Sequence, residues 1–244
     1  MGKTKFVFFS VTFLVLTIVL PYSSEGVSLD YWNWRNPLPQ GSYLTKVEYL
    51  NGIFVAVGEN GAIVTSSDGV YWVARNSGTN EPLCDVAYGN GIFVAISRFG
   101  TILTSPDAEV WTIRKTAQKE PYTIYLLNVS YVNGVFAATG YGAVYTSHDG
   151  IDWILTKIEG YSSIGKVISG NGIYVTVGSR GTDHVLVSSD AIKWTVAPMP
   201  DTFQRVYALS YVNGTFMIWG QAAAVSSYWG ETLYTFFNGM EWTA

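Results

Sequence analysis

The sequence predicts an all-β fold, and three observations support that prediction. The chain contains five copies of one segment, each beginning at an Asn-Gly pair and ending at a tryptophan. The Asn-Gly pairs begin at residues 51, 90, 133, 171 and 213, so the segment recurs with a period of about 40 residues. Each copy is rich in β-branched and aromatic residues and is divided by turn-forming residues. This combination is typical of a β-propeller, and we predict four antiparallel strands in each blade.

The first copy shows how the four strands, A to D, are expected to follow one another. Residues 46–50 alternate in polarity and predict strand A, which Asn51-Gly52 joins to strand B at residues 53–57 through a favoured two-residue turn. The near-continuous apolar run of strand B predicts burial on both faces of the sheet. Residues 59–61 then turn the chain into strand C at residues 62–66, and a second tight turn leads to strand D at residues 71–75.

The turn between strands C and D carries a repeated Ser-x-Asp-Gly-x-x-Trp pattern. We expect the Asp to accept hydrogen bonds from the following backbone N–H groups, the Gly to adopt a positive φ and the Trp to cover the hairpin. Because one active site does not need the same acid in every repeat, we interpret these residues as structural. They are Asp68, Trp72, Asp107, Trp111, Asp149, Trp153, Asp190, Trp194, Asn238 and Trp242.

Three motifs together resemble those of the Asp-box (bacterial neuraminidase repeat, or BNR) β-propellers: this turn, Phe-Val-Ala-Val-Gly at residues 54–58 and Arg-Asn-x-Gly-Thr at residues 75–79. The resemblance covers residues 30 to 244 and is closest to exported bacterial repeat proteins of the sialidase-like kind. The superfamily also includes sialidases and photosystem II assembly factors, so the resemblance implies a fold more specifically than an activity. The Asp-to-Trp spacing is one residue shorter than in the usual sialidase repeat, which weakens the enzymatic interpretation.

Five repeats predict five blades, and the first residues of the repeat region suggest how the ring closes. Trp32 and Arg35 have the same Trp-x-x-Arg spacing as Trp72 and Arg75, so residues 30–35 resemble the end of a further repeat. Trp242 lies where strand D of the fifth repeat would begin. We therefore expect the N-terminal strand to complete or flank the last blade and to protect an open sheet edge. We expect a monomer; a dimer or a degenerate sixth blade is the alternative.

Residues 1–26 are predicted to be a signal peptide and residues 27–244 the propeller domain. Two lysines precede an apolar run at residues 6–20, and Pro21 and small residues follow it. Because the run is short for a membrane span, we expect a secreted or periplasmic protein that is not an integral membrane protein after cleavage. An uncleaved N-terminal anchor is the alternative. The single cysteine, Cys84, allows no internal disulfide and is expected to pack as a small apolar residue.

Composition and motifs argue against several classes of function. The formal net charge of −4 predicts no broad cationic surface for nucleic acid. His148 and His184 have no partners at the spacing of metal ligands, and the glycine-rich stretches precede no predicted helix. We therefore expect no metal and no cofactor.

The predicted strand order places the A–B and C–D turns on one face of the propeller and the B–C loops and D–A connections on the other, which we call the B–C face. The turns repeat, whereas the B–C face varies between copies, and variation is the better guide to a site. Residues 179–184 are expected to form one of the B–C loops. Arg98, Arg180 and Arg205 are candidates for a shared anion site. An insertion at residues 221–231 brings two aromatic residues that either form a binding rim or cover a blade junction. The candidate ligand-binding residues are Arg98, Phe99, Tyr141, Arg180, Asp183, His184, Arg205, Tyr228 and Trp229.

These observations favour an exported, non-catalytic propeller that binds a glycan or a protein partner on its B–C face, with no catalytic residue assigned. A sialidase-like glycoside hydrolase is the alternative, and an assembly or scaffold factor for a membrane complex is a further one. The Phe-Arg-Ile-Pro motif of sialidases has no match, since residues 36–39 are Asn-Pro-Leu-Pro. A carboxylate pair contributed by different blades cannot be recognised in a sequence, so the hydrolase alternative stays open.

Overall fold

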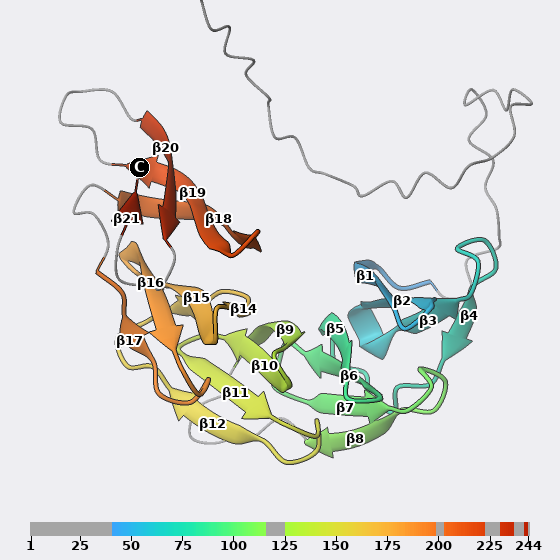
Figure 1. The fold of residues 1–244 in the computed structure, drawn as a ribbon. Coiled ribbons are helices and arrows are strands. Elements are labelled where there is room, and N and C mark those ends of the chain that lie inside the picture. The colour runs from blue at the N-terminus through green and yellow to red at the C-terminus, as the bar shows by residue number, and fades with distance from the viewer. Residues whose placement is uncertain (1–40, 116–124, 199–202, 223–229, 237–241, 244) are drawn as a thin grey trace, which may run out of the picture. The chain divides into compact units, whose positions relative to one another are not determined.

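The computed structural model describes residues 41–115, 125–198, 203–222, 230–236 and 242–243. Within these ranges the regular structure is β-strand apart from one 3₁₀ turn, η1 (Glu59–Gly61). The strands form five antiparallel sheets, which we number 1 to 5 along the chain (Figure 1). The predicted signal peptide and the predicted closing strand at residues 30–35 lie outside the described residues.

In sheets 1, 2, 3 and 5, strands that are consecutive in the chain are neighbours in the sheet. Sheet 1 contains β1 (Leu44–Leu50), β2 (Ile53–Gly58), β3 (Ile63–Ser66) and β4 (Val73–Arg75). Sheet 2 contains β5 (Leu83–Gly89), β6 (Ile92–Ser97), β7 (Ile102–Ser105) and β8 (Thr112–Lys115). Sheet 3 contains β9 (Leu126–Val132), β10 (Val135–Gly140), β11 (Ala143–Ser147) and β12 (Ile154–Lys157).

The last two sheets vary the same plan. Sheet 4 contains β13 (Ser163–Ile164), β14 (Ile168–Gly170), β15 (Ile173–Arg180), β16 (Thr182–Ser188) and β17 (Thr195–Val196). Sheet 5 contains β18 (Phe203–Val212), β19 (Thr215–Ala222), β20 (Gly230–Phe236) and β21 (Trp242–Thr243). In sheet 4, β13 and β14 both pair with β15 and together occupy the place of strand A.

The prediction of four antiparallel strands in the order A to D is confirmed in sheet 1 and in its repeats. Strand D of sheet 1 begins at Val73 and not at Tyr71, because Tyr71 and Trp72 belong to the preceding turn. The predicted insertion spans residues 221–231, but its ends belong to strands, so the loop is shorter than the insertion. Gln221 and Ala222 of β19 pair with Glu231 and Gly230 of β20.

The Asn-Gly pairs form the predicted two-residue hairpin turns between strands A and B. In all five copies both residues have positive φ, at 47° to 50° for the Asn and 77° to 84° for the Gly. A turn with two positive φ values follows the right-handed twist of the strands that it joins, and Asn and Gly reach that conformation at the lowest steric cost. The repeated dipeptide therefore fixes the A–B register in every sheet.

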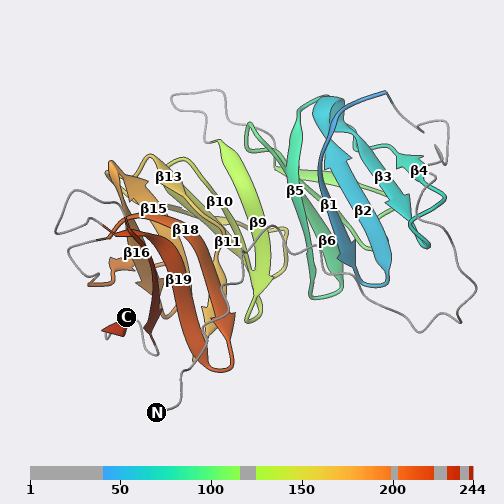
Figure 2. The same ribbon diagram turned by 90° about the horizontal axis from the view of Figure 1, so that it is seen from above.

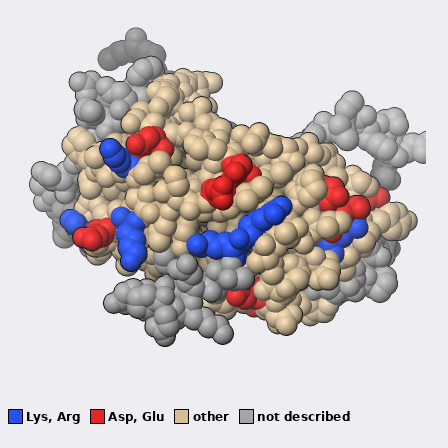
Figure 3. Space-filling model, turned by 90° about the horizontal axis from the view of Figure 1, so that it is seen from below, with Lys and Arg blue, Asp and Glu red and all other residues tan. Residues whose placement is uncertain are grey.

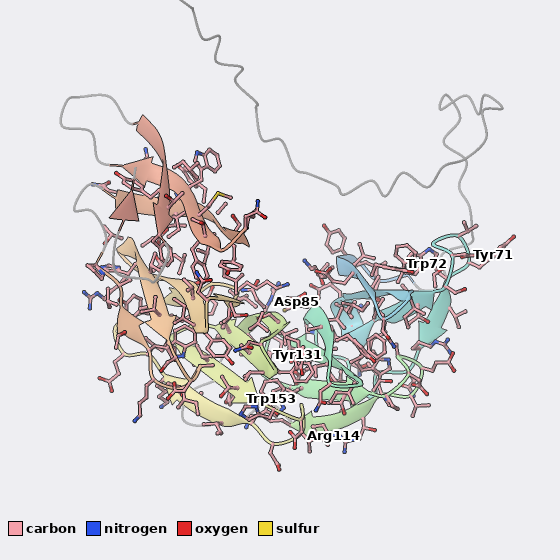
Figure 4. The ribbon with its side chains drawn as sticks, viewed as in Figure 1. Tyr71, Trp72, Asp85, Arg114, Tyr131 and Trp153 are labelled. Atoms are coloured by element: carbon pink, nitrogen blue, oxygen red, sulfur yellow. The ribbon has the colours of Figure 1, made fainter. Side chains whose placement is uncertain are left out.

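The C–D turn is held together by a single carboxylate oxygen. In sheet 3, Asp149 Oδ1 accepts hydrogen bonds from the backbone N–H of Ile151 and Asp152, at 2.8 and 2.9 Å, and from the hydroxyl of Ser147 at 2.9 Å. Trp153 Nε1 donates to the carbonyl of Gly150 at 2.9 Å, and Gly150 has a φ of +72°. Asp149 and Trp153 thus make the hydrogen bonds expected of a structural turn, and Figure 4 shows Tyr71 and Trp72 of the sheet 1 turn beside β4.

The same bonds recur at the C–D turns of sheets 1, 2 and 4, centred on Asp68, Asp107 and Asp190. At Asp107 and Asp190 an alanine replaces the glycine and still takes a positive φ of about +60°. Backbone N–H bonds to the carboxylate lower the pKa of all four aspartates below the ordinary value. Asn238 and the side chain of Trp242, the fifth copy, lie outside the described residues.

The core is formed by strands B and C, which are buried on both faces in sheets 2 and 3. A tyrosine from strand A, a phenylalanine from strand B and the tryptophan of the C–D turn pack in series at the turn end of each of the first three sheets. The Tyr–Phe ring centroids are 4.6 Å apart in each case, and the Phe–Trp centroids are 6.1 to 6.5 Å apart. These sets are Tyr49–Phe54–Trp72, Tyr88–Phe93–Trp111 and Tyr131–Phe136–Trp153.

Each sheet packs its strand A against the neighbouring sheet; Figure 2 shows β1 beside β5. Tyr131 of sheet 3 lies against Gly89 of sheet 2, where a Cβ on the glycine would lie 2.0 Å from the ring. Polar side chains also tie adjacent sheets together by hydrogen bonds to backbone groups. These bonds run from Thr45 Oγ1 to Leu83 O (2.7 Å), from Val129 N to Asp85 Oδ2 (2.9 Å), from Ser130 Oγ to Val167 O (2.9 Å) and from Val206 N to Asp183 Oδ2 (2.9 Å).

Asp85 is the most buried acid that makes a hydrogen bond between sheets, and Figure 4 shows it on β5. Burial raises the pKa of its carboxyl, while Lys166 Nζ at 3.9 Å and the N–H groups of Val129 and Val86 act in the opposite direction. Because both carboxylate oxygens accept backbone bonds, we interpret Asp85 as a structural residue.

We predict that Asp149→Ala lowers the Tm by about 2–4 °C, because three donors lose their shared acceptor. Asp149→Asn retains Oδ1 and should keep most of the Tm, as the natural asparagine at position 238 suggests. Differential scanning calorimetry at pH 7 measures both; equal Tm values for wild type and Asp149→Ala would contradict the role of this bond.

The pH dependence of the Tm provides a second prediction for Asp149. Because folding lowers the pKa of Asp149, the carboxylate stabilises the fold above the unfolded pKa of about 3.9, and this contribution is lost as the pH falls through the folded pKa. The Tm should therefore fall less between pH 7 and pH 3 in Asp149→Asn than in wild type. Equal falls would contradict the assigned pKa direction.

Candidate functional site

The two faces of the sheets differ in how much of their polar surface is already used. On the turn face, the aspartates of the four described C–D turns are committed to backbone N–H groups. The B–C face instead carries exposed aromatic and basic side chains at the ends of strands B and before strands A. We therefore describe the candidate site on that face.

Three exposed rings form a continuous row on the B–C face. Phe99 follows β6, Tyr125 precedes β9 and Tyr141 follows β10. Their ring centroids are 5.8 Å apart for Phe99–Tyr125, with planes tilted by 58°, and 5.6 Å apart for Tyr125–Tyr141, with an edge-on angle of 71°. The exposed fractions are 36%, 39% and 54%. We call these three residues the aromatic row.

Backbone hydrogen bonds fix the segments that carry the aromatic row. The carbonyl of Tyr125 accepts from Tyr141 N at 2.9 Å, and the carbonyl of Arg98 accepts from Leu126 N at 3.0 Å. Gly140 permits the close approach, because a Cβ there would lie 1.8 Å from the carbonyl oxygen of Tyr125. The row is thus held in place before any ligand binds, which reduces the entropic cost of binding.

Arg98 directly precedes Phe99 of the aromatic row and is exposed. Its backbone N–H donates to the carbonyl of Pro82 at 2.9 Å, and its side chain lies near the thiol of Cys84. Burial raises the pKa of the Cys84 thiol, while Arg98 acts in the opposite direction. Cys84 is half-buried on β5, and its thiol donates to the carbonyl of Pro82 at 3.9 Å.

Arg180 and His184 meet at a residue that the sequence did not single out. The guanidinium of Arg180 lies 5.5 Å from the ring centroid of Tyr161, and the His184 ring contacts the same tyrosine edge-on at 5.7 Å. Residues 179–184 were expected to form a loop. They instead extend β15 and β16 into a hairpin, because Gly181, with a φ of +83°, closes a tight turn at the end of the strand pairing.

Asp183 points to the junction with sheet 5. Its Oδ2 accepts the bond from Val206 N, and it lines a cavity of about 370 Å³ together with Lys166 and Tyr207. The structure thus separates Asp183 from its neighbour His184, since successive side chains of a strand face opposite sides. The inter-sheet hydrogen bond gives Asp183 a structural role beside any contact with a ligand.

Arg205 is exposed on β18, opposite Gln221 of β19. Tyr228 and Trp229 lie outside the described residues, so their assignment stays a prediction. The contacts of the described residues place Arg98 in sheet 2, Arg180 in sheet 4 and Arg205 in sheet 5. No contact among them joins these three arginines, and the shared anion site also stays a prediction.

Sequence reasoning missed Tyr125, although a signal was present. The pair Tyr125-Leu126 begins eight residues before Asn133. In the first repeat, the matching pair Tyr43-Leu44 begins eight residues before Asn51. The same offset before Asn213 gives Arg205. A comparison of the segments before strand A would therefore have shown that this position varies between the repeats.

The described part of the chain has neither a metal-binding cluster nor a membrane-spanning helix. It contains no group of three or more His, Cys, Asp or Glu side chains arranged to hold a metal ion. None of its helices is long and apolar enough to span a membrane. Figure 3 shows one face on which Lys and Arg side chains alternate with Asp and Glu among uncharged surface. On that face, local contacts rather than a field of one sign would have to provide recognition.

Comparison with solved structures shows a β-propeller fold. YCF48 from Cyanidioschyzon merolae matches with a TM-score of 0.54 and 16% identity, over 85% of this chain and 86% of that chain. YCF48 bound to a D1 peptide matches with a TM-score of 0.60 and 15% identity, over 89% and 71% of the two chains. The GH74 enzyme of Niastella koreensis matches with a TM-score of 0.55 and 15% identity, over 83% of this chain but only 30% of that chain.

At this level of identity the likenesses show the fold alone. No protein-family model matches the sequence, and the search of the curated proteins finds no match either. The repeated sheets and the propeller architecture are therefore shown, and the activity has to be argued from the site.

We predict that Gly140→Ala destabilises the protein by about 1–3 kcal/mol, because the added methyl group collides with the backbone at Tyr125. It should also change the near-ultraviolet circular dichroism of the tyrosines, since the edge contact between Tyr125 and Tyr141 depends on this approach. Gly41→Ala is the matched control, because a Cβ at Gly41 meets nothing within 4 Å. Equal unfolding free energies for the two variants would contradict the assigned role of Gly140.

Proposed function

We propose that this protein is an exported, non-catalytic β-propeller of the Asp-box type that binds a protein partner through the aromatic row on its B–C face. In this proposal the five sheets are five blades of a monomer, closed by the strand at residues 30–35, and a signal peptide at residues 1–26 directs export to the periplasm or the medium. The single observation that carries the binding role is the exposed and backbone-fixed row Phe99–Tyr125–Tyr141.

The physical chemistry of the aromatic row suits a protein partner. Tyrosine and phenylalanine are enriched at protein interfaces, because they bury a large apolar area with few rotatable bonds. The rings are tilted by 58° and 71° to one another, so they offer gaps for side chains more than a flat stacking surface. Two tyrosine hydroxyls add hydrogen-bonding groups for a polypeptide backbone.

The comparison with a propeller that carries a bound D1 peptide supports a peptide as the kind of partner. A glycan is the other partner expected from the sequence, and it would have to stack on rings that are not parallel. An assembly or scaffold role rests on fold analogy alone.

The hydrolase alternative finds less support in the described acids. Glu81 accepts a hydrogen bond from the hydroxyl of Ser97, and Asp183 and Asp85 accept hydrogen bonds from backbone N–H groups of neighbouring sheets. Acids that are occupied in this way are poor candidates for the unencumbered carboxylate pair that glycoside hydrolysis needs. The proposal therefore assigns no catalytic residue.

The test is selection of a random twelve-residue peptide display library on the purified protein, followed by affinity measurement with synthetic copies of the enriched peptides. We expect micromolar Kd values and at least a tenfold loss of affinity in the double variant Phe99→Ala/Tyr141→Ala. Tyr71→Ala is the matched control, because Tyr71 is 72% exposed on the opposite, C–D turn face.

Two results would overturn the proposal. One is the absence of any enriched peptide, and the other is an equal loss of affinity in Tyr71→Ala and in the double variant. If a glycan array instead retained the wild-type protein and not the double variant, the partner would be a glycan and the protein-partner assignment would be wrong.

A further inference from the structure

A second candidate site lies away from the aromatic row, in the groove between sheets 3 and 4. A cavity of about 340 Å³ opens between two parts of the structure. One is β12 with the residues that follow it, and the other is β15 to β17 of sheet 4. Its lining includes Lys157, Glu159, Tyr161, Arg180, Leu186 and Trp194. This volume is at the lower end of the range for small-molecule pockets. A cavity of this size admits a single ring but not a segment of a polymer. We call it the Arg180 cavity.

Arg180 is positioned in this cavity without being neutralised. The guanidinium of Arg180 lies over the Tyr161 ring. A Cβ at Gly160 would lie 3.3 Å from Cδ of Arg180, so the glycine leaves just enough room for the arginine side chain. Within the described part of the chain, Arg180 has no ion pair and its side chain has no hydrogen-bond acceptor. A planar fork of N–H donors in this state matches the two oxygens of a carboxylate.

Tyr161 provides a second, independent indication of a ligand. Its side chain lines the cavity and is only 9% exposed, yet its hydroxyl has no hydrogen-bond partner among the described residues. A buried hydroxyl without a partner costs about 1–3 kcal/mol. A ligand oxygen that accepted a bond from this hydroxyl would remove that cost.

Trp194 provides an apolar wall. Its indole N–H donates to the carbonyl of Ala191 at 3.0 Å, so the ring is fixed and no indole donor remains for a ligand. The half-buried ring can therefore contribute only its face, which suits a sugar ring or an aromatic ring. Glu159 carries a negative charge at the same rim, which disfavours ligands with several anionic groups.

We propose that the Arg180 cavity binds a carboxylate that is attached to a single ring. Arg180 holds the two carboxylate oxygens, the Tyr161 hydroxyl donates to one of them, and the ring lies against Trp194. The ring is that of a sugar acid or of an aromatic acid, since both present the same chemistry to these three side chains. The inference does not rest on the proposed peptide site, which uses other residues on sheets 2 and 3.

Isothermal titration calorimetry on the purified protein tests the inference with glucuronate and benzoate as the two ring acids. Glucose lacks the carboxylate, and acetate and inorganic sulfate lack the ring. We expect at least one ring acid to bind with a Kd at or below about 1 mM, and all three control compounds to bind at least tenfold more weakly. The acid that binds identifies the source of the ring.

Variants separate a binding role from a structural one. Arg180→Gln should weaken binding at least tenfold, whereas Arg114→Gln, at an exposed arginine of sheet 2, should leave binding unchanged. Tyr161→Phe should weaken binding severalfold while the Tm stays equal or rises, because an unpartnered buried hydroxyl is removed. The inference would be overturned if acetate or sulfate bound as tightly as the ring acid, or if Arg180→Gln bound the ring acid as tightly as wild type. It would also be overturned if neither ring acid bound.

Discussion

Strands B and C of the central sheets are buried on both faces, and the rest of the structure depends on this constraint. β6, β7, β10 and β11 are almost entirely inaccessible, so none of these sheets could remain folded without an apolar neighbour on each side. Repetition meets that need, because a copy of the same sheet offers the same apolar face. The hydrogen bonds of Thr45, Asp85, Ser130 and Asp183 between sheets then fix how each copy sits on the next.

This constraint also separates the two ends of the sheets. At the turn end, the Asn-Gly pairs and the aspartate turns have a geometric task in each repeat, and the Tyr–Phe–Trp packing beneath them leaves little freedom to vary. At the other end the connections need only join strands, so their side chains can differ from one sheet to the next. The aromatic row and the Arg180 cavity both use that freedom, although one is an exposed surface and the other a recess.

The sequence was sufficient for features that depend on a few consecutive residues. The Asn-Gly turns, the hydrogen bonds of Asp149 and the order of strands A to D all follow from local chemistry that each copy repeats. The polar run from Ser179 to His184 was misinterpreted as a loop. It forms the ends of β15 and β16, since an exposed hairpin extension can carry polar residues and needs only Gly181 to turn.

Contacts between sheets could not be predicted in the same way. Phe99 and Tyr125 are 26 residues apart in the sequence and belong to neighbouring sheets, so their contact follows from how sheet 3 packs on sheet 2. Arg180 and Tyr161 are also distant in the sequence, by 19 residues within the sheet 4 repeat, and they meet because β13 and the residues before it bring the tyrosine back over β15. A pattern in one strand contains no information about such contacts.

Hydrogen–deuterium exchange with and without a display-selected peptide tests directly whether binding takes place on the B–C face. We expect slower exchange at residues 97–101 and 140–143, which carry and flank Phe99 and Tyr141. We expect unchanged exchange at the C–D turns, residues 66–72 and 147–153. Slower exchange confined to those turns would contradict binding on the B–C face, because the peptide would then occupy the face whose polar groups are already used by the fold.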